Sequence, residues 1–401
     1  MNGILNGMRV VEGSAFVAAP SGGMTLASLG ADVIRFDLPG GGLDYKRWPV
    51  AKSGQSLYWA GLNKGKRSIT VDFRTPKGQE ILTALICSEG ENKGLFLTNF
   101  PAKGWLDYEN LKKRRSDLIM LNVKGDRHGG SQVDYTVNPR VGFPTATGFE
   151  DSEPVNHMLP AWDLITGQMG AVGLLAAERH RRLTGQGQLI NLPLADVAMA
   201  TLGNLGIIGE VMINKEDRPR YGNFMYGAFG KDFETKDGKR IMIIAISLRQ
   251  WSGLCRATDS TEEMEGLSRR LKLDFREEGN RFLARESIAA LLIPWMKSHD
   301  LQEIEKVFEA NGVCWGPYQT FREFVESDPE CTVENPLFKK VNQPGIGDYL
   351  VPGYPVDFSA VPRVEPGPAP ELGADTDEVL SIELGLSDSE IGKLHDQKIV
   401  V

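Results

Sequence analysis

Residues 8–37 read MRVVEGSAFVAAPSGGMTLASLGADVIRFD and decide the fold class. The short apolar run Met8–Glu12 predicts a buried strand, and a turn rich in glycine, alanine and proline follows it. A helix is expected over Ser21–Leu29, because Gly30 is typical of the position just after a helix. The next strand is expected over Ala31–Phe36. A strand, a turn, a helix and a second strand in this order predict one βαβ unit of a mostly parallel sheet.

The same alternation continues along the chain, so its first half predicts an α/β fold. Further strands are expected over Ser68–Phe73, Leu95–Thr98, Leu118–Val123 and Gln188–Leu192, and helices over Asp163–Arg182 and Ala195–Val211. Thr75-Pro76 offers an N-cap followed by proline at the first helical position. Residues 225–325 differ in character and predict a separate α+β domain. The last segment carries two helix starts, at Asp375 or Thr376 and at a capping box that begins at Ser387.

Composition excludes several classes of protein. The chain has 401 residues and a net charge of −8, so no general affinity for nucleic acid or anionic membranes is expected. Residues 1–6 lack the basic and apolar parts of a signal peptide, and no run approaches the roughly 18–20 apolar residues of a membrane span. The four cysteines are scattered, which favours reduced thiols: Cys87, Cys255, Cys314 and Cys331. We therefore expect a cytoplasmic protein with neither a membrane nor a nucleic acid as partner.

Two common kinds of ligand are also disfavoured by the residues. The turn after the first strand lacks the GxGxxG pattern of dinucleotide-binding folds, and Gly40-Gly41-Gly42 follows the second strand instead. The five histidines lie far apart, without the spacing of metal ligands: His128, His157, His180, His299 and His395. We expect no metal site and no nicotinamide cofactor.

One carboxylate stands at a position suited to chemistry. Residues 125–160 form a long segment with glycine and proline, typical of a ligand-covering loop, and lead into the helix that begins near Asp163. The residues alone favour a helix N-cap for Asp163. The alternative is an ionised nucleophile held at the positive end of a helix, and the two roles are compatible.

Eight stretches, in order along nearly the whole chain, point to one enzyme family. They are Val10–Glu12, Ala18–Pro20, Leu29–Arg35, Leu62–Ile69, Asn99–Phe100, Asp163, Arg181–Gln188 and Leu372–Leu380. In these stretches the sequence resembles the class III, formyl-CoA-transferase-like family of CoA-transferases and acyl-CoA racemases. Val10–Pro20 and Gly40–Val50 are most similar to members that shift coenzyme A between the C1 and C4 carboxylates of mesaconyl-CoA.

The resemblance implies an architecture and a substrate. Residues 1–213 would form the first part of a Rossmann-like, CoA-binding large domain, and residues 326–401 would complete it. Residues 225–325 would form the small α+β domain, and two chains would make an interlocked homodimer. The implied substrate is an acyl-CoA dicarboxylate, and no cofactor is implied because coenzyme A is part of that substrate.

The resemblance also assigns roles to single residues. The family's catalytic aspartate falls on Asp163, which would carry acyl anhydride and CoA thioester intermediates in turn. Phe16 and Arg47 are expected at the acyl group, with Arg47 holding the free carboxylate. Backbone amides near the start of the Asp163 helix are expected to stabilise the oxyanions. Contacts with coenzyme A are expected from Val17, Ala18, Val71, Asp72, Phe73, Arg74, Asn99, Phe100 and Lys124.

Three positions depart from patterns within the family. Val17 stands where formyl-CoA transferases have glutamine, and Leu38 stands where many relatives have a basic residue. Val133 precedes Asp134 at the place where racemases have histidine, so an acid–base racemase is the weaker alternative. An intermolecular transferase that uses a separate acceptor acid would share the same nucleophile and stays open.

Overall fold

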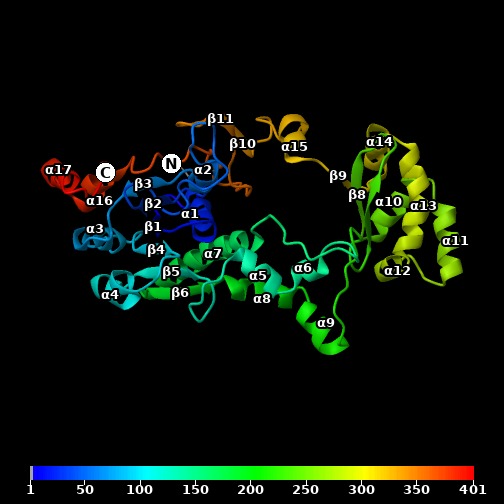
Figure 1. Ribbon diagram of the computed structural model, residues 1–401, viewed down its shortest axis with the longest axis horizontal. Coiled ribbons are helices and arrows are strands. Elements are labelled where there is room, and N and C mark those ends of the chain that lie inside the picture. The colour runs from blue at the N-terminus through cyan, green and yellow to red at the C-terminus, as the bar shows by residue number, and fades with distance from the viewer. Residues whose placement is uncertain (1–2) are drawn as a thin grey trace. The chain divides into compact units, whose positions relative to one another are not determined.

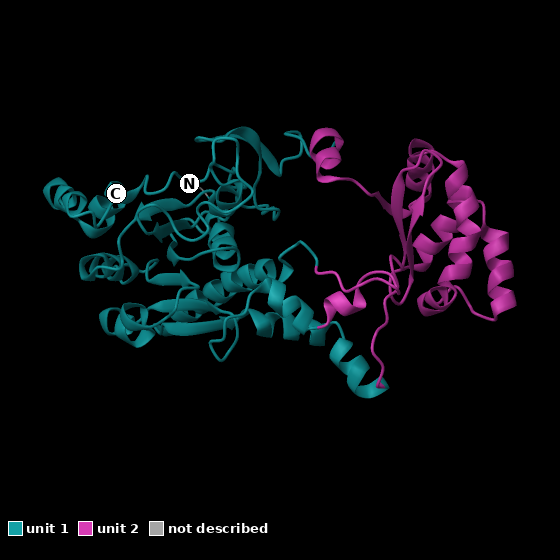
Figure 2. Cartoon of the chain, in the orientation of Figure 1, with its two compact units in different colours: residues 1–141, 157–214, 329–401 teal, residues 142–156, 215–328 magenta. Residues whose placement is uncertain are grey.

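The computed structural model describes residues 3–401, so the expectation about residues 1–6 lies partly outside the described residues. The chain divides into two compact units (Figure 2). Unit 1 comprises the described residues up to Val141 together with residues 157–214 and 329–401. Unit 2 comprises residues 142–156 and 215–328. The short segment 142–156 therefore belongs to unit 2, although it lies within the 1–213 range that the sequence suggested for one domain.

Unit 1 is built on a six-stranded parallel sheet, which confirms the α/β class (Figure 1). Its strands are β1 (Arg9–Gly13), β2 (Asp32–Asp37), β3 (Arg67–Thr70), β4 (Leu95–Thr98), β5 (Ile119–Lys124) and β6 (Gln188–Pro193). The spatial order is β3-β2-β1-β4-β5-β6, and Val11 of β1 lies opposite both Ile34 of β2 and Phe96 of β4. The strand order reverses between β1 and β4, and open α/β sheets bind ligands at such a point.

Helices and a hairpin complete unit 1. They are α1 (Ala18–Ser28), α2 (Leu57–Asn63), α3 (Pro76–Ile86), the 3₁₀ turn η1 (Gly104–Leu106), α4 (Tyr108–Arg114), α5 (Asp134–Arg140), α7 (Ala161–Thr184), α8 (Leu194–Asn204), α9 (Ile207–Asn214), β10 (Phe338–Gln343), β11 (Gly347–Pro352), α16 (Thr376–Leu384) and α17 (Asp388–Asp396). Helices α1 and α7 approach closely because Gly167 has no side chain. A Cβ atom there would lie 2.0 Å from Ser21 Oγ and 2.7 Å from the Ala18 carbonyl oxygen.

The C-terminal segment packs against β3, an edge strand of the sheet. The Asp375 carboxylate accepts a hydrogen bond of 2.7 Å from the Ser68 amide, and Val71 pairs with Val400 in an antiparallel bridge. The expected helix starts are confirmed, because Asp375 is the N-cap of α16 and Ser387 opens α17 with a capping box. Residues 329–401 therefore share the core of unit 1.

Unit 2 contains a small antiparallel sheet covered by helices. Its elements are α6 (Phe143–Ala146), β7 (Phe229–Glu234), β8 (Arg240–Ala245), α10 (Leu248–Ala257), α11 (Thr261–Leu271), α12 (Glu278–Leu283), α13 (Arg285–Ser298), α14 (Leu301–Asn311), β9 (Cys314–Pro317) and α15 (Phe321–Ser327). The strands lie in the order β7-β8-β9. Phe229, Ile241 and Phe308 lie in its own hydrophobic core, so the unit has the layered build of an α+β fold.

Several boundaries differ from the expected ones. Helix α1 begins at Ala18, because Pro20 is tolerated in a first helical turn and alanine favours helix. Strand β3 ends at Thr70, before the expected Phe73. The single helix expected over 195–211 is broken into α8 and α9, since Gly206 adopts a left-handed φ of 77°.

Over residues 3–401 no single helix is long and apolar enough to cross a membrane. The pair α8 and α9, bent by 61°, meets the criterion of length and composition only when the two helices are taken together.

Candidate active site

Asp163 lies in the first turn of α7 and lines a cavity of about 680 Å³. The helix begins at Ala161 with Pro160 as its N-cap, so the expectation that Asp163 is the N-cap is wrong. The proline ring sets the entry into the helix but offers no side-chain acceptor. The cavity takes residues from the ends of β1 and β5 and from the loop after β4, beside the reversal in strand order. It brings together seven of the expected residues: Phe16, Val17, Ala18, Arg47, Asn99, Lys124 and Asp163.

The electrostatic setting of Asp163 makes its carboxylate unusually basic. Burial raises the pKa of Asp163 to about 7, the charge of Asp134 adds to the increase, and the charge of Arg47 opposes it. Within residues 3–401 no hydrogen bond reaches the Asp163 carboxylate oxygens. A carboxylate of raised pKa that keeps its lone pairs free is suited to nucleophilic attack.

The amides at the start of α7 are already occupied. The Ala161 amide donates to the Leu159 carbonyl oxygen over 2.8 Å, and the Asp134 carboxylate accepts from the amides of Trp162 and Asp163 at 2.7 and 3.2 Å. The expectation that these amides stabilise oxyanions is therefore wrong for this arrangement. The amides of Val17 and Ala18 at the start of α1 donate no hydrogen bond in the described part of the chain, and both residues line the cavity.

Arg47 is held between two aromatic rings. Its guanidinium carbon lies 5.5 Å from the ring centre of Phe16 and 5.2 Å from that of Tyr58. Burial raises the pKa of Tyr58 to about 12, and the positive charge of Arg47 opposes that increase. The phenol therefore stays protonated and can donate a hydrogen bond. Ring faces orient a guanidinium, and arginine has five N–H donors, so its hydrogen bond with Tyr58 leaves other donors for an anion.

A buried ionic network holds the loop that carries Phe16. Phe16 adopts a positive φ of 69°, and its amide donates to the Asp44 carboxylate over 2.9 Å. Asp44 also accepts from Arg35 at 3.1 Å, and Arg35 pairs with Asp37 at 2.8 Å. Arg35 and Asp44 are each 1% exposed. Because removing one partner would leave a buried charge unpaired, this network fixes the loop firmly.

Asn99 lines the cavity and also forms hydrogen bonds with the backbone of Ala15. Its side-chain oxygen accepts from the Ala15 amide at 3.0 Å, and its side-chain nitrogen donates to the Ala15 carbonyl oxygen at 2.8 Å. Both polar groups of the side chain therefore brace the loop after β1. The loop after β4 is in this way linked to the loop after β1 at the reversal in strand order.

A second, mostly apolar cavity of about 780 Å³ lies next to the first, and Ala15 lines both. The expected residues Phe73 and Phe100 line it, with ring centres 6.0 Å apart. Trp105 lies 6.1 Å from Phe73 and extends this aromatic group. Leu38 lines the same cavity, and Lys103 is the one cation among its described lining residues.

Three expected CoA contacts lie elsewhere. Val71 is fully buried in the core of unit 1, with its amide bonded to the Asp37 carbonyl oxygen. Arg74 pairs with Asp72 at 2.8 Å, and the Arg74 side chain is 70% exposed. None of the three lines either of the two cavities.

Residues that the sequence did not single out also contribute to the site. These residues are Asp134 and Tyr58, which line the Asp163 cavity, and Trp105, which lines the apolar cavity. Their partners are distant in the sequence: Asp134, for example, accepts from the amide of Asp163, 29 positions away. The pair Val133-Asp134 was noted only for the histidine that Val133 replaces. The structure places Val133 in the lining of the Asp163 cavity with 56% of it exposed.

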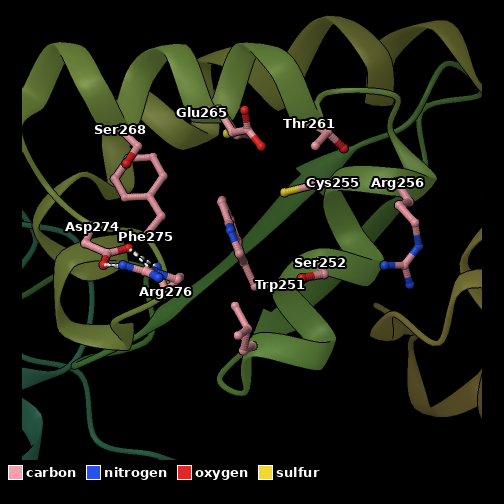
Figure 3. Close-up of a pocket in the computed structure, with 12 residues that line it drawn as sticks. Trp251, Ser252, Cys255, Arg256, Thr261, Glu265, Ser268, Asp274, Phe275 and Arg276 are labelled. Atoms are coloured by element: carbon pink, nitrogen blue, oxygen red, sulfur yellow. Dashed lines mark hydrogen bonds and ion pairs between the residues drawn. The ribbon is translucent and has the colours of Figure 1, made fainter.

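The remaining chemistry in the chain does not form a competing site. Unit 2 has a cavity of about 490 Å³ between α10 and α11 (Figure 3). Burial raises the pKa of Cys255 in its wall to about 12, so the thiol stays protonated, and Asp274 is paired with Arg276 at 2.6 Å (Figure 3). Across residues 3–401 no group of three histidine, cysteine, aspartate or glutamate side chains is arranged to hold a metal ion.

Comparison with known proteins identifies the family. The model of CoA-transferase family III matches residues 5–376. The 2-methylfumaryl-CoA isomerase of Chloroflexus aurantiacus is 61% identical, covering 100% of this chain and 98% of that protein. The succinyl-CoA:mesaconate CoA-transferase of Haloarcula marismortui is 28% identical over 94% of this chain and 96% of its own. A CaiB/BaiF family protein from Brucella suis superimposes with a TM-score of 0.76 at 26% identity, over 95% of this chain and 100% of its own. The chain belongs to CoA-transferase family III, as the resemblance in its sequence predicted.

Proposed function

We propose that this enzyme moves coenzyme A between the C1 and C4 carboxylates of mesaconyl-CoA, converting 2-methylfumaryl-CoA into 3-methylfumaryl-CoA. The observation that carries this proposal is the Asp163 carboxylate of raised pKa, which lines the same cavity as Arg47. The full-length identity of 61% to a 2-methylfumaryl-CoA isomerase supports the same reaction. Asp163 is the nucleophile, and Arg47 holds the carboxylate that is not esterified.

Coenzyme A fits the pair of cavities that meet at Ala15. The adenine ring stacks in the apolar cavity, where Phe73, Phe100 and Trp105 offer aromatic faces. Lys103 at the rim neutralises phosphate charge. The pantetheine arm then passes the loop at residues 15–18, which brings the thioester to Asp163.

The reaction proceeds through two covalent states of Asp163. An Asp163 oxygen attacks the thioester carbonyl carbon, the C–S bond breaks, and a mixed anhydride and CoA thiolate form. The thiolate attacks the aspartyl carbonyl carbon, the anhydride C–O bond breaks, and mesaconate leaves as a dicarboxylate. The other carboxylate of mesaconate attacks the aspartyl thioester, and the same steps run in reverse. The amides of Val17 and Ala18, which donate no hydrogen bond in the described part of the chain, stabilise the oxyanions in this mechanism.

The first test separates transfer within one molecule from transfer between two. Purified enzyme and 2-methylfumaryl-CoA, with no added acid, should give 3-methylfumaryl-CoA at full rate. Isotopically labelled free mesaconate should enter the product slowly or not at all. A strict requirement for added acid would instead establish an intermolecular transferase, the reaction named for the relative at 28% identity.

A second test addresses the covalent intermediate. Hydroxylamine or borohydride should trap Asp163 in the wild type during turnover, and mass analysis should place the adduct on the peptide that contains it. The Asp163→Asn variant should bind substrate but give neither product nor adduct. The racemase alternative predicts deuterium uptake from solvent at an α-carbon, yet Val133 supplies no proton carrier to the cavity.

A second copy of the chain is the partner that we infer. Helices α7, α8 and α9 and the loop between the last two expose many apolar side chains in the single chain: Met169, Val172, Leu183, Met199, Leu205, Ile208, Val211, Met212 and Ile213. Helix α9 buries none of its residues. Exposed apolar surface of this kind is typical of a protein interface. Sedimentation should report a homodimer, and Ile213→Asp should weaken it, whereas a monomeric wild type would refute this assignment.

A further inference from the structure

The first turn of α7 is capped from a distant part of the chain. Its local N-cap, Pro160, has no side-chain acceptor, and the Asp163 side chain caps nothing. Asp134 of α5 performs this task, because one of its oxygens, Oδ2, accepts from the amides of both Trp162 and Asp163. One turn further along α5, Asn138 accepts from the Trp162 indole N–H at 3.0 Å. Helix α5 therefore holds the start of α7 in two ways, through the backbone amides of Trp162 and Asp163 and through the Trp162 side chain.

Asp134 is a charged and deeply buried residue, and capping alone requires neither property. Asp134 is 1% exposed, and its second oxygen, Oδ1, has no hydrogen-bond partner in the described chain. A buried carboxylate with an unsatisfied oxygen is unfavourable, and an asparagine would supply the same acceptor without a charge. The charge therefore needs a reason other than capping.

The neighbouring free carboxylate supplies that reason. Asp163 carries a negative charge only between turnovers, because its anhydride and thioester forms are neutral. The charge of Asp134 repels the free carboxylate but not the acylated residue. The same charge disfavours the step that releases CoA from Asp163 and regenerates its free carboxylate. These charged and titratable groups line the cavity around Asp163: Arg47, Tyr58, Lys124, Asp134 and Tyr135.

We propose that Asp134 is a positioning residue that orients Asp163 through its backbone and, through its charge, favours the aspartyl–CoA intermediate over the free carboxylate. This inference rests on the proposed function, because it needs a covalent intermediate on Asp163. It also explains why the amides at the start of α7 are unavailable to an oxyanion: Asp134 occupies two of them.

The test compares Asp134→Asn with Asn138→Ala. The asparagine keeps an acceptor for both amides and removes the charge, whereas Asn138→Ala removes an anchor on the same helix without changing any charge. In Asp134→Asn the acid limb of the kcat/KM profile should move to lower pH by about 0.5–1 unit. The fraction of enzyme trapped as aspartyl–CoA at steady state should fall at least threefold. Asn138→Ala should lower the rate but leave the limb and the trapped fraction unchanged.

Two results would overturn the inference. One is an unchanged acid limb in folded Asp134→Asn, and the other is an equal shift in Asn138→Ala, which would mark a structural effect. If Asp134→Asn does not fold, Asp134→Ser replaces it, because serine also keeps an acceptor at the start of α7 without the charge: the same shift of the acid limb supports the inference, and an unchanged limb refutes it. Absence of any aspartyl–CoA adduct in the wild type would instead refute the proposed function itself.

Discussion

Replacing Asp163 by asparagine should stabilise the protein, and the gain should grow with pH. The folded pKa of Asp163 is raised from 3.8 to about 7, mainly by burial. The folded chain therefore holds this proton more tightly than the unfolded chain. Well below pH 3.8 the carboxyl group is protonated in both the folded and the unfolded state, so its ionisation does not lower the unfolding free energy. Stability is lost as the pH rises from 3.8 through 7.

The magnitude follows from the size of the pKa difference. A difference of about 3 units corresponds to ~4 kcal/mol above pH 7, and ~1.6 kcal/mol of that is already lost at pH 5. Asp163 is partly exposed, so solvent screening reduces the remaining change, and we expect the advantage of Asp163→Asn to grow by ~1–2 kcal/mol between pH 5 and pH 8.5.

Equilibrium unfolding in urea measures this change. Wild type and Asp163→Asn are compared at pH 5 and pH 8.5 and at one protein concentration, because any association would shift the midpoint. Asp274→Asn is the matched control: a hydrogen bond from Arg276 lowers the pKa of Asp274 to about 2, so this variant should gain no stability at high pH. An advantage of Asp163→Asn that is equal at both pH values would show that burial does not destabilise the free carboxylate.

Three further substitutions test the surroundings of Asp163. Arg47→Lys keeps the charge but loses the planar donor fork, so kcat/KM for 2-methylfumaryl-CoA should fall by roughly 10–100-fold, and an unchanged value would remove Arg47 from substrate binding. Asp44→Ala removes one carboxylate partner of buried Arg35 and should lower the unfolding free energy by about 3 kcal/mol, measured in urea. A change below ~1 kcal/mol would show that this network contributes little to stability. Phe100→Leu keeps the apolar volume but loses the ring face, so KM should rise about 5–10-fold with little change in kcat, and a fall in kcat alone would place adenine elsewhere.

Local sequence patterns predicted those elements whose determinants are neighbours in the chain. The strand over Leu95–Thr98 is matched residue for residue, because a short, fully buried parallel strand appears as a continuous apolar run. The N-cap at Thr75 with Pro76 behind it is confirmed, since its hydrogen bond spans only three residues. Capping at Ser387 is confirmed for the same reason. In these places the residues that cause the structure stand next to one another in the sequence.

The contacts that shape the candidate site arise between residues far apart in the sequence, so local patterns could not reveal them. The Asn99 amide braces Ala15 across 84 positions, and Asp134 caps α7 across 28. The expectation of an N-cap at Asp163 shows the consequence. An aspartate before an apolar helix is the usual sign of a cap, but here a second aspartate on α5 takes the cap and leaves the first with free oxygens. Two carboxylates at one helix start are poorer for stability than one, and because Asp134 takes the cap, the Asp163 oxygens keep the free lone pairs that the proposed covalent chemistry requires.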